Sequence, residues 1–242
     1  MNRAALLLRS ARRVAVLTGA GISAESGIPT FRDALTGFWA RFRAEDLATP
    51  EAFRRDPETV WRWYRERRLG LARVEPNPGH HALAELARRV PSCILITQNV
   101  DGLHRRAGSP EVVELHGNLT RVKCADQGHP AAAFADTEPV PRCAVCGSLL
   151  RPDVVWFGEL LPPEALGRAN QAAASCDLFL SVGTSNLVEP AASLPWIAAR
   201  NGAAVLVVNT TAEGQRTGPN IHHLVGPAGV VLPELVRESW PR

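Results

Sequence analysis

The sequence predicts an α/β fold, with a doubly wound, mostly parallel sheet and a smaller inserted domain. Two observations carry this prediction. Four short apolar segments have the composition of buried parallel strands, and stretches with helical spacing separate them. Two further stretches, residues 36–78 and 120–150, break the alternation and are therefore expected to be insertions between strands.

The predicted strands each end in small or polar residues, and ligands bind beyond the carboxyl ends of the strands in such sheets. We therefore expect the functional site at these ends.

Residues 1–13 contain too short an apolar stretch for a secretory signal and are expected to form an amphipathic helix. The predicted strands are residues 14–17, 92–97, 178–182 and 204–208, and the predicted helices between them include residues 79–90, 162–175 and 190–201.

The composition is that of a globular protein. Hydrophobic residues make up 45% of the chain, and no apolar run approaches the roughly 20 residues that span a bilayer, so no membrane association is expected. Basic and acidic residues are nearly balanced, with a net charge of +3, so the charge does not imply nucleic-acid binding. The five cysteines are an odd number in a chain of this size, which argues against a disulfide framework and favours a cytoplasmic location. We expect a monomer.

A glycine turn follows the first predicted strand. Gly19, Ala20 and Gly21 fit the start of the dinucleotide-binding fingerprint, with Ala24 at its third small position. This pattern indicates a Rossmann-like sheet, because the second glycine lets the backbone approach a pyrophosphate at the start of a helix. Small residues after a strand are common in parallel sheets, so the turn alone is a weak signal.

A dehydrogenase of this fold would need an acidic residue about 20 positions after the glycine turn to bind the ribose. Asp33 comes too early for this role. Glu45 and Asp46 lie in the helical insertion without a preceding strand. A hydride-transferring enzyme is therefore disfavoured.

Six motifs along nearly the whole chain together resemble the sirtuin family of NAD-dependent protein deacylases. The resemblance implies that NAD is a co-substrate and that acylated lysine-containing proteins are the partners, with free lysine, nicotinamide and acyl-ADP-ribose as products. The motifs are TGAGIS (18–23), GIPTFR (27–32), TQNVDGLH (97–104), LHGN (115–118), VVWFGE (154–159) and GTS (183–185).

The resemblance assigns two catalytic roles. His116 would be the general base that deprotonates a ribose hydroxyl, a task suited to an imidazole with an ordinary pKa of about 6.5. Asn99 would hold the ribose and an ordered water. Without the resemblance, a lone histidine is more often a packed or surface residue, and Asn99 and Asp101 could form a capping turn.

Other positions are expected to bind the cofactor. Asp101 would contact the nicotinamide carboxamide, Gln98 would belong to the same pocket, and Ala228 would contact adenine. The resemblance also implies cofactor contacts from Gly19, Ala20, Gly21, Thr30, Phe31, Arg32, Asn99, Gly183, Thr184, Ser185 and Asn209.

Tyr64 and Arg67 are three residues apart on a predicted helix and hence on one face. Their spacing matches the Tyr-x-x-Arg pattern of the sirtuin branch that prefers acidic acyl groups, because a guanidinium and a phenol can hold a carboxylate. Ala48 resembles the small residue that widens the acyl pocket in that branch. Succinyl-, malonyl- or glutaryl-lysine should therefore be handled at least as well as acetyl-lysine. A solvated helix face is expected for Arg62, Arg65 and Arg68.

The resemblance implies that Val154 and Phe157 also bind substrate. They lie in an extended segment whose exposed edge can pair with a peptide backbone, opposite residues 186–188. On pattern alone, an ordinary core strand explains this segment equally well.

Cys143 and Cys146 have the spacing of half a zinc site, and Cys124 lies 19 residues earlier. The family's pattern has a second cysteine pair, but glutamine occupies the partner position, 127. His129 could complete a tetrahedral, structural zinc site of zinc-ribbon type. The alternative is that the site is degenerate or lost.

The resemblance also suggests a division of the chain. Residues 1–35, 79–119 and 151–242 would form the Rossmann-like NAD-binding domain, with a helical insertion at 36–78 and a zinc-binding insertion at 120–150. The main alternative function is an NAD-dependent mono-ADP-ribosyltransferase. A zinc-containing binding module without enzymatic activity is disfavoured because the charge is nearly balanced.

Overall fold

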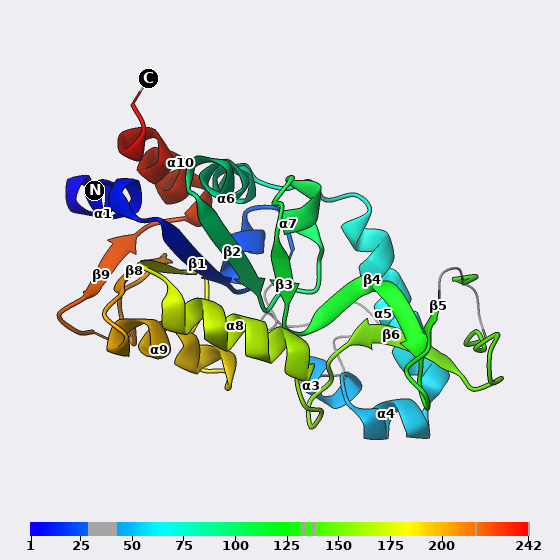
Figure 1. Cartoon of the computed structure of the whole chain (residues 1–242). Helices are drawn as coiled ribbons and strands as arrows, with labels where there is room; N and C mark the ends of the chain where they lie inside the picture. Colours follow the sequence, from blue (N-terminus) through cyan, green and yellow to red (C-terminus); the bar gives the residue numbers. More distant parts are fainter. Residues whose placement is uncertain (29–42, 132–133, 137–138, 216, 242) are drawn as a thin grey trace.

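The computed structural model describes residues 1–28, 43–131, 134–136, 139–215 and 217–241. Its larger unit is a six-stranded sheet in which all neighbouring strands are parallel, in the order β3-β2-β1-β7-β8-β9 (Figure 1). This confirms the predicted doubly wound sheet. The strands are β1 Arg13–Thr18, β2 Ser92–Thr97, β3 Val112–Glu114, β7 Leu178–Val182, β8 Ala204–Asn209 and β9 Ile221–Val225.

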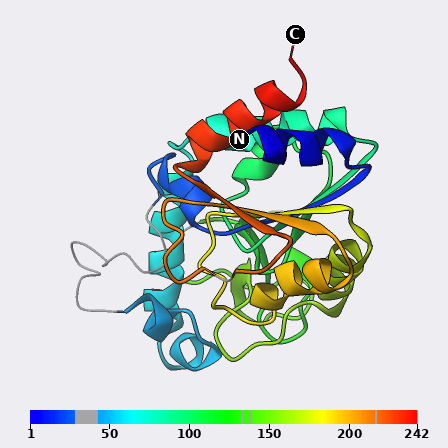
Figure 2. The same cartoon turned by 90° about the vertical axis from the view of Figure 1, so that its left-hand side faces the viewer.

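Helices cover both faces of this sheet, as Figures 1 and 2 show from two directions. Side chains of β1 alternate between the two faces: Val14 and Val16 belong to one hydrophobic core, and Ala15 and Leu17 to the other. The first core is covered by α1 Asn2–Ser10, α6 Pro78–Arg89 and α10 Ala228–Ser239, and the second by α8 Pro163–Ser175 and α9 Leu194–Arg200, which follows the short 3₁₀ turn η2 Ala191–Ser193.

The two outer strands, β3 and β9, were not predicted. β3 is three residues long, which is too short for a periodicity to be recognised. β9 carries His222 and His223 and is partly buried along most of its length, as an edge strand can be. Both strands owe their place to pairing with a neighbour rather than to a strong local pattern.

The smaller unit, in the part that the structure describes, combines three helices with an antiparallel sheet in the order β5-β4-β6. Phe53, Trp61 and Tyr64 from the helices share one hydrophobic core with Leu119 and Val154 from the sheet. Segments far apart in the sequence thus form one packed unit, on the right of Figure 1. Its elements are α3 Ala44–Leu47, α4 Pro50–Arg55, α5 Pro57–Leu71, β4 Gly117–Cys124, β5 Pro130–Ala131 and β6 Leu150–Val154.

Several helices begin with a capping residue followed by proline. The side chains of Thr49, Asp56 and Asn77 accept backbone hydrogen bonds at the starts of α4, α5 and α6, and each is followed by a proline at the first helical position. The cap satisfies an otherwise free N–H, and proline has no N–H to lose there. Among the described residues, no helix is long and apolar enough to cross a membrane.

Arg68 corrects the prediction of a solvated arginine face. Its side chain is 8% exposed and donates two hydrogen bonds to Asp136, at 2.9 and 2.6 Å. Its guanidinium also lies 4.8 Å from the centroid of the Trp61 ring. Helical spacing alone cannot reveal this, because the covering group comes from a segment 68 residues later. Arg62 and Arg65 are partly buried.

The two sheets meet where β3 is followed by β4. Glu114, at the end of β3, accepts hydrogen bonds from Arg105, Asn118 and Arg121, at 3.3, 2.8 and 2.7 Å. Its side chain is only 8% exposed, so the carboxylate depends on these donors. Arg121 also donates to Asp153 on β6 at 3.1 Å, which ties the larger sheet to the smaller one.

Gly117 at this junction should not tolerate a side chain. Its φ is +80°, and a Cβ would overlap the carbonyl oxygen of Asp153. We expect Gly117→Ala to lower the free energy of unfolding by at least about 2 kcal/mol, measured by urea denaturation. Gly70→Ala is the matched control, because it lies within α5 with open space around it and should stabilise by up to about 1 kcal/mol. Equal effects of the two substitutions would contradict this account.

Candidate functional site

The carboxyl ends of three adjacent strands meet at one edge of the larger sheet. Thr18 of β1 lies beside Thr97 of β2 and Val182 of β7 in the strand register. The loops that follow are therefore brought together, although they are about 80 residues apart in the sequence. As predicted, this edge gathers polar side chains from three separate motifs.

The glycine turn after β1 packs backbone against backbone with the loop after β7. The N–H of Gly19 donates to Val182 and that of Gly21 donates to Gly183, at 3.0 and 2.8 Å. A Cβ at position 21 would lie 2.7 Å from the Gly183 carbonyl oxygen. Glycine is therefore required here by contact within the protein, and Ala20 is the intervening residue. The helix that follows, α2 Gly21–Ala24, has four residues.

Asn99 is fixed by two hydrogen bonds that it donates. Its Nδ2 donates to the carbonyl oxygen of Gly19 at 3.0 Å and to Ser23 Oγ at 3.1 Å. Both amide hydrogens are thereby used within the protein. The amide oxygen of Asn99 is left as the group that can accept a hydrogen bond from a hydroxyl or a water.

Asp101 is buried and linked to the same serine. Ser23 donates to its Oδ2 at 2.8 Å, and the backbone N–H of Leu103 donates to its Oδ1 at 2.9 Å. Burial raises the pKa of Asp101, while these two hydrogen bonds and the charge of Arg67 act in the opposite direction. Ser23 lies in a recognised motif, but its role in joining Asn99 to Asp101 was not predicted.

Two buried histidines support this network and were also not predicted. The backbone N–H of Asn77 donates to Nδ1 of His80, so the hydrogen of that ring is on Nε2, facing Ser23 Oγ at 3.4 Å. His104 Nε2 lies 2.9 Å from Thr18 Oγ1. Burial lowers the pKa of His80 to about 4 and that of His104 to about 3. Both rings are neutral at pH 7 and act as fixed hydrogen-bonding groups.

His116 lies between β3 and β4, and its tautomer follows from one contact. Its Nδ1 is 2.9 Å from the backbone oxygen of Gln98, which can only accept a hydrogen bond. The hydrogen is therefore on Nδ1, and Nε2 carries a free lone pair. Burial lowers the pKa of His116, and the Gln98 hydrogen bond partly opposes this. The ring thus stays neutral, and able to accept a proton, at pH values where an exposed histidine is already charged.

Other predicted cofactor residues lie at the same edge. Thr184 accepts a hydrogen bond from Gln98 at its hydroxyl and one from Asn209 at its carbonyl, both at 3.1 Å. Ser185 follows in the same loop and is partly buried. Ala228 begins α10, where the N–H of the next residue donates to Glu25 in the loop after α2. Thr30, Phe31 and Arg32 fall outside the described residues.

The predicted substrate residues lie in and around the core of the smaller unit. Ala48, Tyr64 and Val154 are buried in it, whereas Phe157 is 48% exposed and donates its backbone N–H to Ala48 at 2.9 Å. The Arg67 guanidinium lies 5.6 Å from the Tyr64 ring centroid. Burial lowers the pKa of Arg67, and the charges of Tyr64 and Asp101 oppose this. Residues 186–188 do not form a strand.

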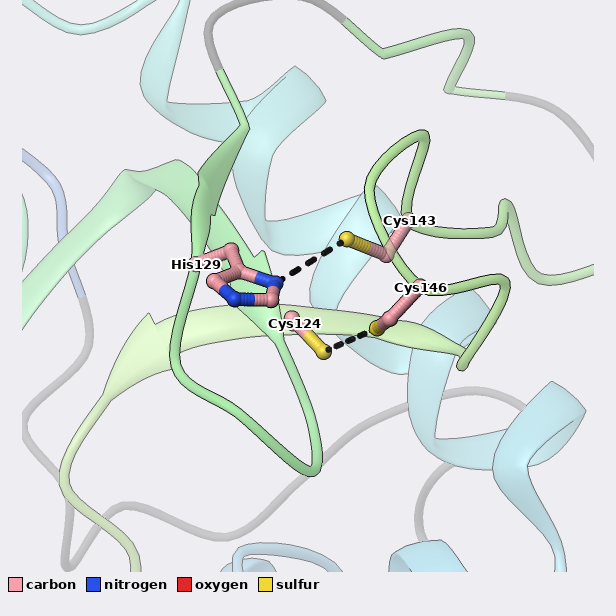
Figure 3. A group of neighbouring side chains, drawn as sticks. All are labelled: Cys124, His129, Cys143 and Cys146. Atoms are coloured by element: carbon pink, nitrogen blue, oxygen red, sulfur yellow. Dashed lines mark hydrogen bonds between the residues drawn. The ribbon is translucent and has the colours of Figure 1, made fainter.

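Four side chains converge at the far end of the smaller sheet, as Figure 3 shows. The ligand atoms of Cys124, His129, Cys143 and Cys146 all lie within 4.8 Å of one another. Cys124 and Cys146 are 3.4 Å apart at their sulfur atoms, and Cys143 Sγ is 3.7 Å from His129 Nδ1. Tetrahedral zinc with Zn–S bonds of ~2.3 Å and Zn–N bonds of ~2.1 Å has ligand separations of ~3.6–3.8 Å. The cluster fits a structural zinc site.

Gln127 contributes to this cluster through its backbone. Its N–H donates to Cys124 Sγ at 3.4 Å. His129 supplies the ligand atom that the family's second cysteine would provide. Four protein ligands leave no open position, and β4 separates the cluster from His116 by eight residues, or roughly 25 Å of strand. The expected metal therefore serves the fold and not the reaction.

A model of the Sir2 family matches residues 19–190, which are most of the chain. The chain belongs to the Sir2 family. The matched residues include the loops after β1, β2 and β7, His116 and all four residues of the cluster. Asn209 and Ala228 lie beyond the matched span, so their expected roles depend on similarity over the full length.

Relatives that match most of this Sir2 protein are found among curated bacterial proteins. NAD-dependent protein deacylase 1 of Pseudomonas aeruginosa is 53% identical over an alignment of 247 positions, which covers 97% of each chain. The NAD-dependent protein deacylase of Thermus thermophilus is 56% identical over 206 residues, which cover 84% of this chain and 81% of that protein.

Solved Sir2 structures have the same fold. A Sir2 homologue crystallised in complex with NAD is 44% identical, with a TM-score of 0.90 over 99% of this chain and 93% of that one. A Sir2 protein bound to an acetylated peptide is 32% identical, with a TM-score of 0.81 over 96% of this chain and 95% of that one.

The zinc site can be tested by exchanging one side chain at a time. We expect the purified protein to contain one zinc per chain by elemental analysis, and chelation to lower its melting temperature, because metal binding contributes directly to folding. His129→Ala should lower the zinc content, whereas Gln127→Ala, two residues earlier, should leave it unchanged. Loss of zinc from the Gln127 variant alone would show that the fourth ligand has been misassigned.

Proposed function

We propose that this Sir2 protein is an NAD-dependent protein-lysine deacylase, with NAD as co-substrate and acylated lysine side chains of proteins as substrates. The observation that carries the proposal is the neutral His116, with a free lone pair on Nε2, beside the strand-end loops. Relatives called NAD-dependent protein deacylases at 53–56% identity support it, as does the fold shared with Sir2 structures that contain NAD or an acetylated peptide.

The backbone loops at Gly19, Gly21 and Gly183 and the side chains of Gln98 and Asn209 are the groups that would hold NAD. They fit a dinucleotide because the small residues of the first loop let a ligand approach the backbone closely at the carboxyl edge of a parallel sheet. When bound, NAD would supply an electrophilic anomeric carbon with nicotinamide as its leaving group, and ribose hydroxyls that can accept the acyl group.

The residues of the protein then position groups and move one proton. Nε2 of His116 would accept the proton of a ribose hydroxyl, which makes that oxygen a better nucleophile toward the acyl carbon. The amide oxygen of Asn99 would accept a hydrogen bond from a hydroxyl or an ordered water. Asp101, held by Ser23 and Leu103, can accept from an amide N–H such as that of a carboxamide.

Replacement of the proposed base tests this function. His116→Ala should lower turnover of an acetylated peptide by about 100-fold or more, since general base catalysis typically contributes that much. Turnover is measured by mass spectrometry of the peptide and by nicotinamide release. His81→Ala, which removes an exposed imidazole on α6, should change it little. Unchanged turnover in the His116 variant would refute the proposal.

Two rival activities give different products in the same assay. A dehydrogenase would raise the absorbance at 340 nm as NADH forms. A mono-ADP-ribosyltransferase would leave label from radioactive NAD on a protein acceptor, with the acylated lysine unchanged. We expect neither outcome.

We further propose that acyl groups ending in a carboxylate, such as succinyl, are accepted at least as well as acetyl. Support comes from Tyr64 and Arg67, which are three residues apart on α5, with the guanidinium beside the phenol ring. The small residue Ala48 belongs to the same core as Tyr64. A carboxylate buried here would gain a charge-assisted hydrogen bond from Arg67 and one from the phenol.

Removal of the guanidinium should change the acyl preference. We expect Arg67→Met to lower the ratio of kcat/KM for succinyl-lysine to that for acetyl-lysine by about 10-fold or more, because a hydrogen bond to a charged group contributes roughly 1.5–3 kcal/mol. Arg65→Met, two residues earlier on the same helix, should leave the ratio near that of the unaltered protein. Equal losses on both peptides in the Arg67 variant would rule out a carboxylate clamp.

A further inference from the structure

Trp156 makes a hydrogen bond that determines how Tyr64 can interact with a ligand. Its indole Nε1 lies 3.0 Å from the Tyr64 oxygen, and the two side chains are almost completely buried. An indole N–H can only donate, so the phenol oxygen is the acceptor. The phenol must then direct its own hydrogen to a different partner. Among the described residues, no group accepts a hydrogen bond from this hydroxyl.

The Trp156 ring is held rigidly by Arg151 and Glu159. The Arg151 guanidinium lies 3.3 Å from the centroid of the indole, a close cation–π contact. Arg151 donates through both terminal nitrogens to Glu159 and also donates to the carbonyl of Val154 at 3.0 Å. Glu159 accepts the backbone N–H of Trp156 at 2.8 Å. The orientation of the indole is therefore fixed at both its backbone and its ring.

These contacts also occupy a carboxylate that acts on the phenol electrostatically, Glu159. Both oxygens of Glu159 are engaged by Arg151, and one of them also accepts from Trp156. The other charged groups near the phenol are the guanidiniums of Arg67 and Arg151, which can only donate. The phenol hydroxyl and Arg67 are thus two donors that can bind the same ligand group. A carboxylate suits them because its two oxygens can accept one hydrogen bond from each donor.

We propose that Trp156 is a specificity-determining positioning residue, whose indole N–H occupies the acceptor side of Tyr64 so that the phenol donates to the terminal carboxylate of an acyl chain. This inference rests on the proposed deacylase function and on the acidic acyl preference. Without the indole N–H, the phenol oxygen is free to accept from Arg67, and the two groups then satisfy each other instead of a carboxylate.

Trp156→Phe tests the inference because it keeps an aromatic ring against Arg151 and removes the N–H. We expect the ratio of kcat/KM for succinyl-lysine to that for acetyl-lysine to fall about three- to tenfold, the range for one neutral hydrogen bond. The loss should be in KM for the succinylated peptide. Trp61→Phe is the matched control, a buried tryptophan of α5 whose indole N–H has no partner among the described residues, and it should leave the ratio unchanged.

A double-mutant cycle separates positioning from a general packing effect. In a Tyr64→Phe background the hydroxyl is absent, so adding Trp156→Phe should cause no further fall in the ratio. Additive losses in the two variants would overturn the inference. Melting temperatures of all variants show whether each one is folded under the assay conditions.

A spectroscopic measurement tests the hydrogen bond without relying on activity. In ¹H–¹⁵N spectra, the indole cross-peak that is missing from Trp156→Phe should shift in Tyr64→Phe, and the other indole cross-peaks should stay in place. No shift of that peak would overturn the inference. The assays also separate its failure from that of the proposed function: if neither peptide is turned over, deacylation itself is wrong, and if acetyl-lysine alone is turned over, the carboxylate preference is wrong and this inference falls with it.

Discussion

The site depends on the close approach of two loop backbones at the carboxyl edge of the larger sheet. Gly21 and Gly183 pack so closely that neither has room for a Cβ. This contact can form because β1 and β7 are adjacent and parallel, so that both loops leave the sheet at the same level. Asn99 reaches the same place from β2 and donates to the carbonyl of Gly19. The positions of the polar side chains follow from the pairing of the three strands.

The second constraint is the junction at which the chain leaves the larger sheet for the smaller one. Glu114 and Gly117 lie on either side of the proposed base, His116. The buried carboxylate gathers three donors, and the glycine allows β4 to run directly against β6. His116 is therefore fixed between two rigid sheets, and its hydrogen bond to Gln98 sets which ring nitrogen can accept a proton. The hydrogen bond at Nδ1 keeps the lone pair on Nε2, which is the ring nitrogen that can accept a proton.

The smaller unit shows how distant segments complete one another. The helical stretch and the cysteine-containing stretch share a hydrophobic core, and the partly buried ion pair between Arg68 and Asp136 joins them. Asp136 lies between two residues of the metal cluster in the sequence, His129 and Cys143. The zinc site, α5 and the Tyr64 side chain are thus parts of one packed structure, which links metal binding to the geometry of the proposed acyl pocket.

The sequence by itself determined the parallel sheet, its four inner strands and the motifs at their ends, because apolar runs and glycine turns are local patterns. It also pointed to the three cysteines of the metal cluster through their spacing, and to His129 as a candidate for the fourth ligand. Tertiary structure decided the rest. The convergence of His129 with the three cysteines, the burial of Arg68 and the neutral state of His80 and His104 depend on which segments pack together. The hydrogen bond from Trp156 to Tyr64 joins residues 92 positions apart. Such contacts have no local pattern, because they arise only when separate elements pack together.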